Sequence, residues 1–314
     1  MSRFLLRSLT LASMAGLLFV VAAEVAGATE LDDYLAEANE ASFAGRQATW
    51  CSYSDHTEFS VISIEHAGSL LMVESAGSSQ MIGGGRNAVS GESGAGVAIS
   101  DWTSIAPTGR YSTGAVDREK RLGRNVAVVT VDEGDQVRAR IWFDEETGAT
   151  LGSEVYSGDG ELFRFSWMLE FDPYPRKIYT MMGDDGSVYD MVVTADPDNL
   201  ADAVAGYTRV DTYAGPDESL HAFYADGLFS FSVFVIEGQV TTSPFSDSDA
   251  MKVDDAEYRW VLTPSDLWVQ WTGDGLTYVL VGDLPPDHLE QVLTELPRPS
   301  RGSILSRLWR GLFG

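Results

Sequence analysis

The sequence predicts an α+β protein made mostly of antiparallel strands, arranged as two sheet-built units behind an export signal. The chain has 314 residues, enough for about two domains of ~150 residues each. With 44% hydrophobic and 11% aromatic residues, it can form real cores and is far from a disordered composition. Apolar residues recur with a period of two over most of the chain, which is typical of strands, and at helical spacing only near the two ends.

The first 28 residues have the layout of a secretory signal. Arg3 and Arg7 precede an apolar run over residues 9–23, and small residues lead up to Ala28. We expect cleavage after Ala28 and a mature chain outside the cytoplasm, either periplasmic or secreted. An uncleaved anchor is the alternative, although the run is short for a membrane span of about 20 residues.

Cys51 is the only cysteine, so the exported chain has no intramolecular disulfide. It lies in a strand-like stretch between Trp50 and Ser52. A buried, inert thiol is favoured there over a reactive one.

Residues 29–182 are predicted to form the first unit, which opens with an amphipathic helix. Its apolar positions at helical spacing are Leu31, Tyr34, Leu35, Ala38 and Phe43. A strand over residues 59–68 and its hairpin mate over residues 70–74 follow. Residues 76–100 are rich in Gly and Ser and are predicted to be a flexible loop. No Gly-Lys-Ser/Thr follows the three glycines at 83–85, which excludes a phosphate-binding loop.

The clearest pattern is a predicted antiparallel meander over residues 125–171. Alternating apolar segments are separated by turns at residues 145–148 and 158–160. Its last segment alternates without a break through Phe163, Phe165, Trp167, Leu169 and Phe171. These side chains either fill a plain core or line a large cavity.

Residues 183–199 are predicted to link this unit to a second one at residues 200–297. The second unit has strand segments at residues 221–225 and 229–236, the latter central because both its faces become apolar. After a polar loop over residues 242–256, the strand segments continue at 258–262, 267–271 and 278–281. A short helix ends the unit, carrying Leu289, Val292, Leu293 and Leu296, with Asp287 near its positive N-terminal end.

The last 17 residues, 298–314, form a basic amphipathic tail on an otherwise acidic chain. They contain four Arg and no acid, with apolar residues at helical spacing. The tail has three possible destinations: its own acidic body, an anionic membrane surface, or a partner. The residues predicted to make this contact are Arg301, Arg307, Trp309, Arg310 and Phe313.

Composition and motifs argue against several function classes. The net charge of −26 disfavours nucleic-acid binding, which depends on neutralising phosphates with Lys and Arg. His56, His66, His221 and His288 are scattered at no ligand spacing, so we expect no metal, no cofactor and no catalytic residues. The sequence therefore favours a binding protein over an enzyme, with a secreted hydrolase as a remote alternative.

Two C-terminal stretches carry a family resemblance. Residues 222–240 (AFYADGLFSFSVFVIEGQV) and 275–293 (GLTYVLVGDLPPDHLEQVL) resemble the C-terminal domain of the MucB/RseB family of sigma-E regulatory proteins. Upstream, Gly123-Arg124, the segment IWFDEETG at 141–148 and Asp159-Gly160 resemble the family's larger domain, which is similar to the lipoprotein carriers LolA and LolB. The resemblance implies a half-open antiparallel β-barrel around a helix, followed by a smaller sheet-plus-helix domain.

The resemblance also implies a regulatory activity. Family members bind the extracytoplasmic part of a membrane-bound anti-sigma factor, protect it from proteolysis, and release it when a lipidic or peptidic envelope-stress ligand binds. Here an acyl chain would occupy an apolar concavity lined by Trp142, Phe163, Phe165, Trp167 and Phe171. Partner contacts are expected at Phe229, Phe231 and Val233. The alternative is a lipid or lipoprotein carrier, which the same barrel would support.

Overall fold

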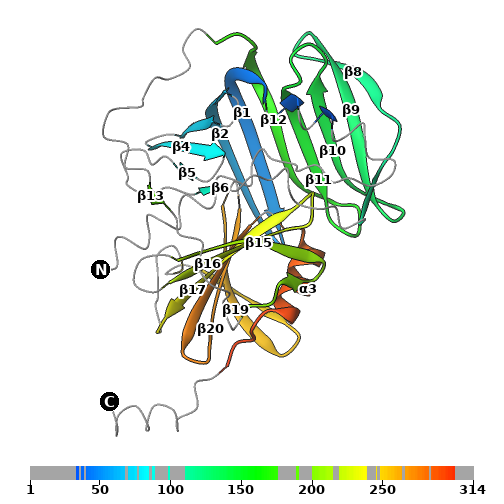
Figure 1. Ribbon diagram of the computed structural model, residues 1–314. Helices are drawn as coiled ribbons and strands as arrows, with labels where there is room; N and C mark the ends of the chain where they lie inside the picture. The colour runs from blue at the N-terminus through cyan, green and yellow to red at the C-terminus, as the bar shows by residue number, and fades with distance from the viewer. Residues whose placement is uncertain are drawn as a thin grey trace, which may run out of the picture.

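The computed structural model contains two mostly antiparallel sheets, one above the other in the view of Figure 1, with a helix beside the smaller one. The structure describes residues 33–34, 37–38, 40–67, 70–75, 78–84, 87–88, 98–99, 110–175, 189–190, 200–214, 219–238, 245, 248–263, 266–282 and 284–300. These sheets and the helix confirm the predicted α+β, mostly antiparallel fold class.

The predicted signal at residues 1–28 lies outside the described residues. No helix among those residues is long and apolar enough to cross a membrane.

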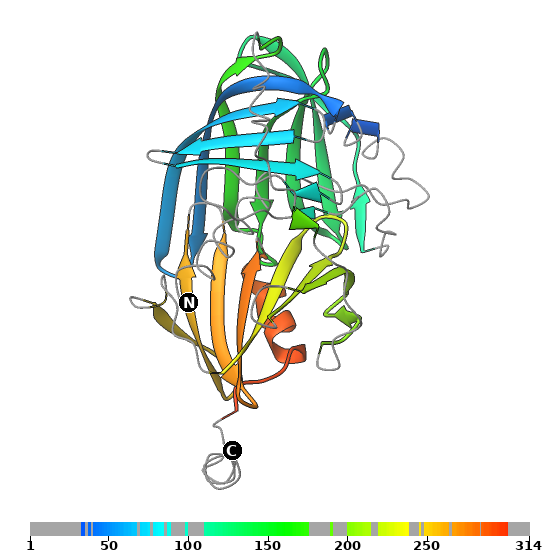
Figure 2. The same cartoon turned by 60° about the vertical axis from the view of Figure 1, so that its left-hand side comes forward.

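The large sheet has the strand order β6-β4-β3-β2-β1-β12-β11-β10-β9-β7, and β8 also pairs with β9. The two outermost strands of this order are not paired with each other, so the barrel is half-open, and Figure 2 shows how strongly the sheet curls from the cyan to the green strands. The strands are β1 (Ser42–Tyr53), β2 (His56–Ala67), β3 (Leu70–Ser75), β4 (Ser78–Gly84), β6 (Ala98–Ile99), β7 (Tyr111–Thr113), β8 (Asp117–Arg121), β9 (Arg124–Glu133), β10 (Gln136–Asp144), β11 (Thr150–Tyr156) and β12 (Leu162–Asp172).

The predicted meander is confirmed as β9 to β12. Its neighbouring strands pair in sequence order, with Ile141 opposite both Val129 and Ser153. Ile141 is 1% exposed and Val129 likewise, so alternation in the sequence did mark a buried face.

The N-terminal helix is shorter than its spacing predicts. Residues 33, 34, 37, 38 and 40 are helical, and Tyr34 stacks on Phe143 with ring centroids 5.1 Å apart. Strand β1 begins at Ser42, so the prediction that Phe43 belongs to the helix is wrong. In the sheet, Phe43 pairs with His66 of β2 and is almost fully buried. Backbone pairing with β2 outweighs the helical spacing of one aromatic residue.

Two predicted irregular segments contain strands. Within residues 76–100, β4 pairs antiparallel with β3, β6 pairs parallel with β4, and β5 (Asn87–Ala88) pairs with β13 (Tyr189–Asp190). The prediction of one continuous loop there is therefore wrong, and β13 interrupts the predicted linker. A strand is held by backbone hydrogen bonds and can form without an alternating side-chain pattern, so the sequence did not indicate these short strands. The other residues of 183–199 lie outside the described part, so the domain boundaries stay predictions.

The small sheet has the order β14-β15-β16-β17-β21-β20-β19-β18. As predicted, the strand after Phe229 is central, because β17 lies between β16 and β21. The predicted loop over residues 242–256 is wrong in part, since it contains β18. The strands are β14 (Ala203–Val204), β15 (Tyr207–Ala214), β16 (Leu220–Ala225), β17 (Ser230–Glu237), β18 (Asp249–Val253), β19 (Ala256–Leu262), β20 (Leu267–Gly273) and β21 (Leu276–Gly282).

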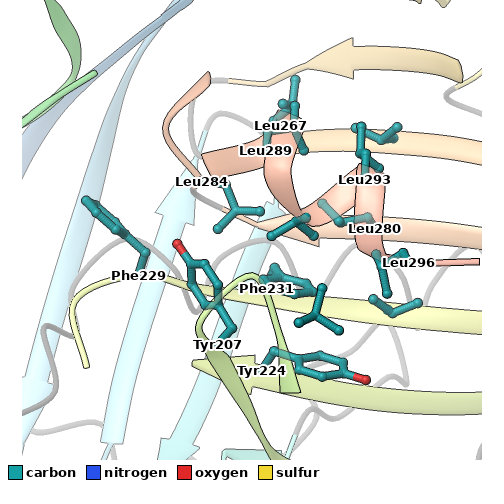
Figure 3. Close-up of a cluster of buried hydrophobic side chains, with 14 of the residues drawn as sticks. Tyr207, Tyr224, Phe229, Phe231, Leu267, Leu280, Leu284, Leu289, Leu293 and Leu296 are labelled. Atoms are coloured by element: carbon teal, nitrogen blue, oxygen red, sulfur yellow. The ribbon is translucent and has the colours of Figure 1, made fainter. Parts of the chain in front are cut away.

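The predicted C-terminal helix is α3 (Pro286–Glu295), which covers one face of the small sheet. Leu289, Val292 and Leu293 are each 0% exposed, and Figure 3 shows the helix leucines beside Leu280 and Phe231 of the sheet. Pro at the first helical position and Asp287 in the first turn suit a helix start.

The tail leaves the small sheet along a fixed path. The indole N–H of Trp271 donates to the carbonyl of Pro297 at 2.6 Å, and Ser300 N donates to Thr272 O at 3.0 Å. Arg298 pairs with Asp254 at 2.9 Å. Residues 301–314, and with them the predicted contact residues Arg301, Arg307, Trp309, Arg310 and Phe313, lie outside the described residues.

Gly152 on β11 provides a test of the packing. A Cβ there would lie 2.3 Å from Cε3 of Trp167, whose ring is covered on a face by the Arg121 guanidinium at 3.4 Å. We expect Gly152→Ala to lower the free energy of unfolding by about 1–3 kcal/mol, because the ring cannot move away freely. Urea unfolding followed by tryptophan fluorescence measures it.

Gly114→Ala is the matched control. The nearest atom to its added Cβ would be Asp132 Oδ2 at 4.0 Å. We expect a change within about 0.5 kcal/mol. Equal stability of the two variants would contradict the close contact described at Gly152.

Candidate binding site

The predicted ligand-binding residues on β12 do not share one face, because two bulges interrupt the strand. Between β11 and β12, Val155 pairs with Arg164 and Tyr156 with Leu162, which leaves Phe163 as an extra residue. Between β1 and β12, a second shift leaves Leu169 extra. Each bulge turns the alternation over, so an unbroken pattern in the sequence is split in space.

The five residues are accordingly distributed over three surroundings. Two are buried clusters, and the third is the stack of Phe165 on Trp50. Phe163 is 3% exposed and belongs to the cluster that contains Cys51 and Val155. Trp142 is 6% exposed in a second cluster, against which Trp167 and Phe171 pack. Trp142 and Trp167 lie together, with ring centroids 4.5 Å apart. The structure thus brings these two together and separates Phe163 from them, while binding of an acyl chain stays a prediction.

Phe165 and Trp167 take part in an aromatic face that crosses the large sheet. We define it by Phe59, Trp50, Phe165 and Trp167, which the register places on neighbouring strands β2, β1 and β12. Trp50 stacks on Phe165 at 5.6 Å, and Phe59 is 58% exposed. Exposed aromatic surface of this kind is typical of a contact site.

The predicted partner-binding residues are buried. Phe229, Phe231 and Val233 are 2%, 1% and 0% exposed, and all three belong to the cluster that continues from the small sheet into the large one. A partner could reach them only if this part of the core opened. Phe229 contacts the charged groups described next, because its ring meets the His288 ring edge to face at 5.5 Å.

A network of charges joins the two sheets, and we call it the charged junction. Its members from the large-sheet part are Arg110, Glu133 and Arg138; those from the small-sheet part are Tyr207, Asp226, Asp287 and His288. The network is a consequence of strand ends: Glu133 ends β9, Arg138 lies near the start of β10, and Asp287 and His288 open α3.

Arg138 is almost fully buried in the junction, at 1% exposed. Its Nη2 donates to Asp287 Oδ2 at 2.6 Å, and its Nε lies 2.8 Å from Glu133 Oε2 as an ion pair that is not aligned for a hydrogen bond. Asp287 also accepts the backbone N–H of Gly158 at 3.0 Å. Burial works to raise the pKa of Asp287, but the hydrogen bond and charge of Arg138 outweigh it and lower that pKa.

Arg110 makes a second set of contacts between the large-sheet part and the small-sheet part. Its Nε donates to Glu133 Oε1 at 2.5 Å and its Nη1 to the carbonyl of Ala205 at 3.1 Å. Asp226 lies 3.5 Å from Nη1 and accepts the Tyr111 hydroxyl at 2.6 Å. Burial raises the pKa of Asp226 against these hydrogen bonds, whereas the pKa of Glu133 is lowered, because the Arg110 bond outweighs its burial.

His288 accepts from both guanidinium groups. Its Nε2 lies 2.7 Å from Arg110 Nη2 and in hydrogen-bond contact with Arg138 Nη2, while Nδ1 lies 2.7 Å from the Tyr207 hydroxyl. Guanidinium N–H groups only donate, so Nε2 must offer its lone pair and the ring proton is assigned to Nδ1. Burial, followed by the two arginines, lowers the pKa of His288 to about 4.

These residues were only partly visible in the sequence. Asp287 was noted for its place at the helix start and His288 as one of four scattered histidines, whereas Arg110, Glu133 and Arg138 had no motif to mark them. Nothing local shows that positions 138 and 288 meet. Within the described residues no group of His, Cys, Asp and Glu could hold a metal ion. The ion pairs and hydrogen bonds of the junction connect the two sheets and can fix their relative orientation.

This architecture defines a class of protein: a half-open antiparallel sheet joined by a buried charged contact to a smaller sheet-and-helix unit. No protein-family model and no curated protein sequence matches the chain significantly. Several solved structures match the chain over most of its length. The MucA/MucB complex of Pseudomonas aeruginosa matches with a TM-score of 0.51 and 21% identity, covering 88% of this chain and 99% of the matched chain.

Two further structures of the same kind match. MucB in complex with MucA(peri) has a TM-score of 0.49 at 19% identity over 86% of this chain and 97% of that one. MucB alone has a TM-score of 0.45 at 20% identity, covering 87% and 98% of the two chains. The chain has the fold of MucB.

Removing the Arg138 charge tests the junction. We expect Arg138→Met to lower the free energy of unfolding by about 2–3 kcal/mol, because Asp287 and Glu133 lose their buried partner while both retain some contact with water. Arg46→Met is the control, since Arg46 pairs with Glu170 on the surface and should cost less than about 1 kcal/mol. Guanidinium chloride unfolding of both variants measures the difference. An unchanged free energy of unfolding in Arg138→Met would contradict this role.

Proposed function

We propose that this chain is an extracytoplasmic regulatory protein that binds the outer segment of a membrane-bound anti-sigma factor and releases it when an envelope-stress ligand binds. The observation that carries the proposal is the MucB fold over 88% of the chain, because the matched MucB chain was solved together with MucA. The sequence resemblance to the MucB/RseB family points the same way.

Several features of the molecule support binding over catalysis. The charged junction joins two sheets through groups that donate or accept hydrogen bonds with each other. The aromatic face offers exposed apolar surface, with Phe59 at its edge. The leader-like pattern of residues 1–28 predicts a mature chain outside the cytoplasm, where the outer segment of a membrane protein is accessible.

Release by a ligand requires linkage between two states. A ligand separates the complex only by as much as it prefers the free protein. Because Phe229, Phe231 and Val233 are buried in a core shared by both sheets, a change in how the sheets meet would alter their accessibility. This is the physical route by which a ligand in the large unit would affect a partner at the small one.

A lipid or lipoprotein carrier is the second candidate. It is favoured by the open edge of the large sheet and by the pair of indoles at Trp142 and Trp167, against which an acyl chain would gain about 0.8 kcal/mol per buried methylene. Fold similarity to carriers alone does not decide between the two functions.

The first function predicts a specific membrane partner. We expect crosslinking of the tagged full-length chain in its own cells to recover a single-span membrane protein in stoichiometric amount, encoded next to its gene. Mass spectrometry of the crosslinked product identifies it. Recovery of no membrane protein from cells that express the chain at normal level would count against a regulator of this kind.

The carrier function predicts bound lipid. If an acyl chain lies against the paired indoles, organic extraction of the purified chain yields about one lipid per protein, and Trp167→Leu lowers that yield several-fold. Tyr174→Leu is the control, because Tyr174 is 68% exposed and lies beyond the end of β12. Equal lipid in all three proteins would show that the lipid is not held at this place.

A further inference from the structure

Besides the apolar cluster that they share, the two sheets meet at two contacts that contain a histidine. One is the charged junction around His288. The other joins the β1–β2 end of the large sheet to β18 and β19, where the Tyr53 ring meets Trp260 edge to face at 5.0 Å and His56 Nε2 lies 3.1 Å from Asp249 Oδ2. In the first contact a histidine accepts hydrogen bonds, and in the second a histidine faces a carboxylate.

We propose that the charged junction is an acid-released latch: protonation of His288 opens the junction while the uncharged Tyr53–Trp260 contact holds, so that the small unit swings away from the large sheet about that contact. The proposal concerns the chain alone and does not depend on the identity of any partner.

The geometry at His288 gives the reason. Nε2 can accept from Arg110 and Arg138 only while it keeps its lone pair. A proton on Nε2 would point at two guanidinium groups, so these hydrogen bonds would be replaced by repulsion. Both arginines belong to the large-sheet part and His288 to α3, so the repulsion acts across the junction.

Other charged groups face the same ring and work against release. Glu133 Oε2 lies 3.1 Å from Nε2 and Asp287 Oδ2 lies 3.9 Å away, and both carboxylates favour a charged ring. Asp226 adds a carboxylate that lies 3.5 Å from Arg110 Nη1 and accepts the hydroxyl of Tyr111. The Tyr207 hydroxyl faces Nδ1. The balance favours the neutral ring, because the nearest hydrogen-bonding groups on Nε2 are cations and the site is buried.

The pH window follows from the direction of the pKa shift. The folded pKa of His288 lies near 4, below the ordinary value of 6.5. The closed junction is therefore fully stable above pH 6.5 and loses stability as pH falls from 6.5 towards 4. The second contact includes the edge-to-face packing of Tyr53 on Trp260, which carries no charge. Acid therefore weakens the charged junction without acting on the Tyr53–Trp260 packing.

His288→Gln and His221→Gln form the matched pair for the test. A Gln at 288 retains an oxygen that accepts from the guanidinium groups but takes up no proton in this range. His221 is also buried with a pKa lowered to about 4, yet it lies within the small sheet, where Nε2 is 2.8 Å from the Ser232 hydroxyl. It controls for acid effects that do not involve the junction.

Small-angle X-ray scattering of the full mature chain between pH 7.5 and 4.5 is the measurement, with far-UV circular dichroism of the same samples. We expect the radius of gyration of the wild type and of His221→Gln to increase at low pH while the sheet signal is kept. His288→Gln should remain compact. No expansion of the wild type, the same expansion in His288→Gln, or loss of the sheet signal together with expansion would each overturn the latch.

A second measurement applies should His288→Gln fail to fold. NMR titration of the His288 ring in the wild type gives its protonation midpoint, expected well below 6.5 and coincident with the midpoint of expansion. A ring that titrates more than one pH unit away from the expansion would overturn the proposal.

Discussion

The burial of Arg138 is the constraint on which the meeting of the two sheets depends. A guanidinium that is 1% exposed cannot lose its proton, so it must be surrounded by groups that compensate for its charge. Those groups come from both parts of the molecule, Glu133 from one and Asp287 from the other. The relative orientation of the sheets is thereby fixed by charge as well as by the apolar cluster they share. An apolar contact alone would tolerate sliding, whereas a hydrogen-bonded charge network has one good arrangement.

The sequence predicted well wherever one face of a strand is buried. The meander β9 to β12, the central strand β17 and helix α3 all carry periodic apolar residues, and all three are present as expected. The sequence did not predict strands that pair through their backbones but lack alternating apolar side chains. β4 is rich in Gly and Ser, β6 is only two residues long, and β18 is largely polar, so none of the three gives an alternating signal. Phe43 failed for a different reason: its helical spacing was real but its neighbours in space are strands.

The candidate site was less predictable than the fold, because bulges and long-range contacts leave no periodic trace. Phe163 and Phe165 are two positions apart in an alternating run, yet one extra residue puts them in different surroundings. Arg138 and His288 are 150 positions apart and meet only because two strand ends and a helix start converge. Alternation marks which residues are buried, but the pairing of strands determines with whom.

Cys51 gives the molecule a practical property. It is the sole thiol and is 1% exposed in the apolar cluster that the two sheets share. A cysteine introduced on the surface would react with a maleimide dye without competition from the native one while the chain is folded. Reaction of Cys51 itself would report that the shared core has opened, so a single native sulfur atom serves as a chemical sensor for the integrity of that core.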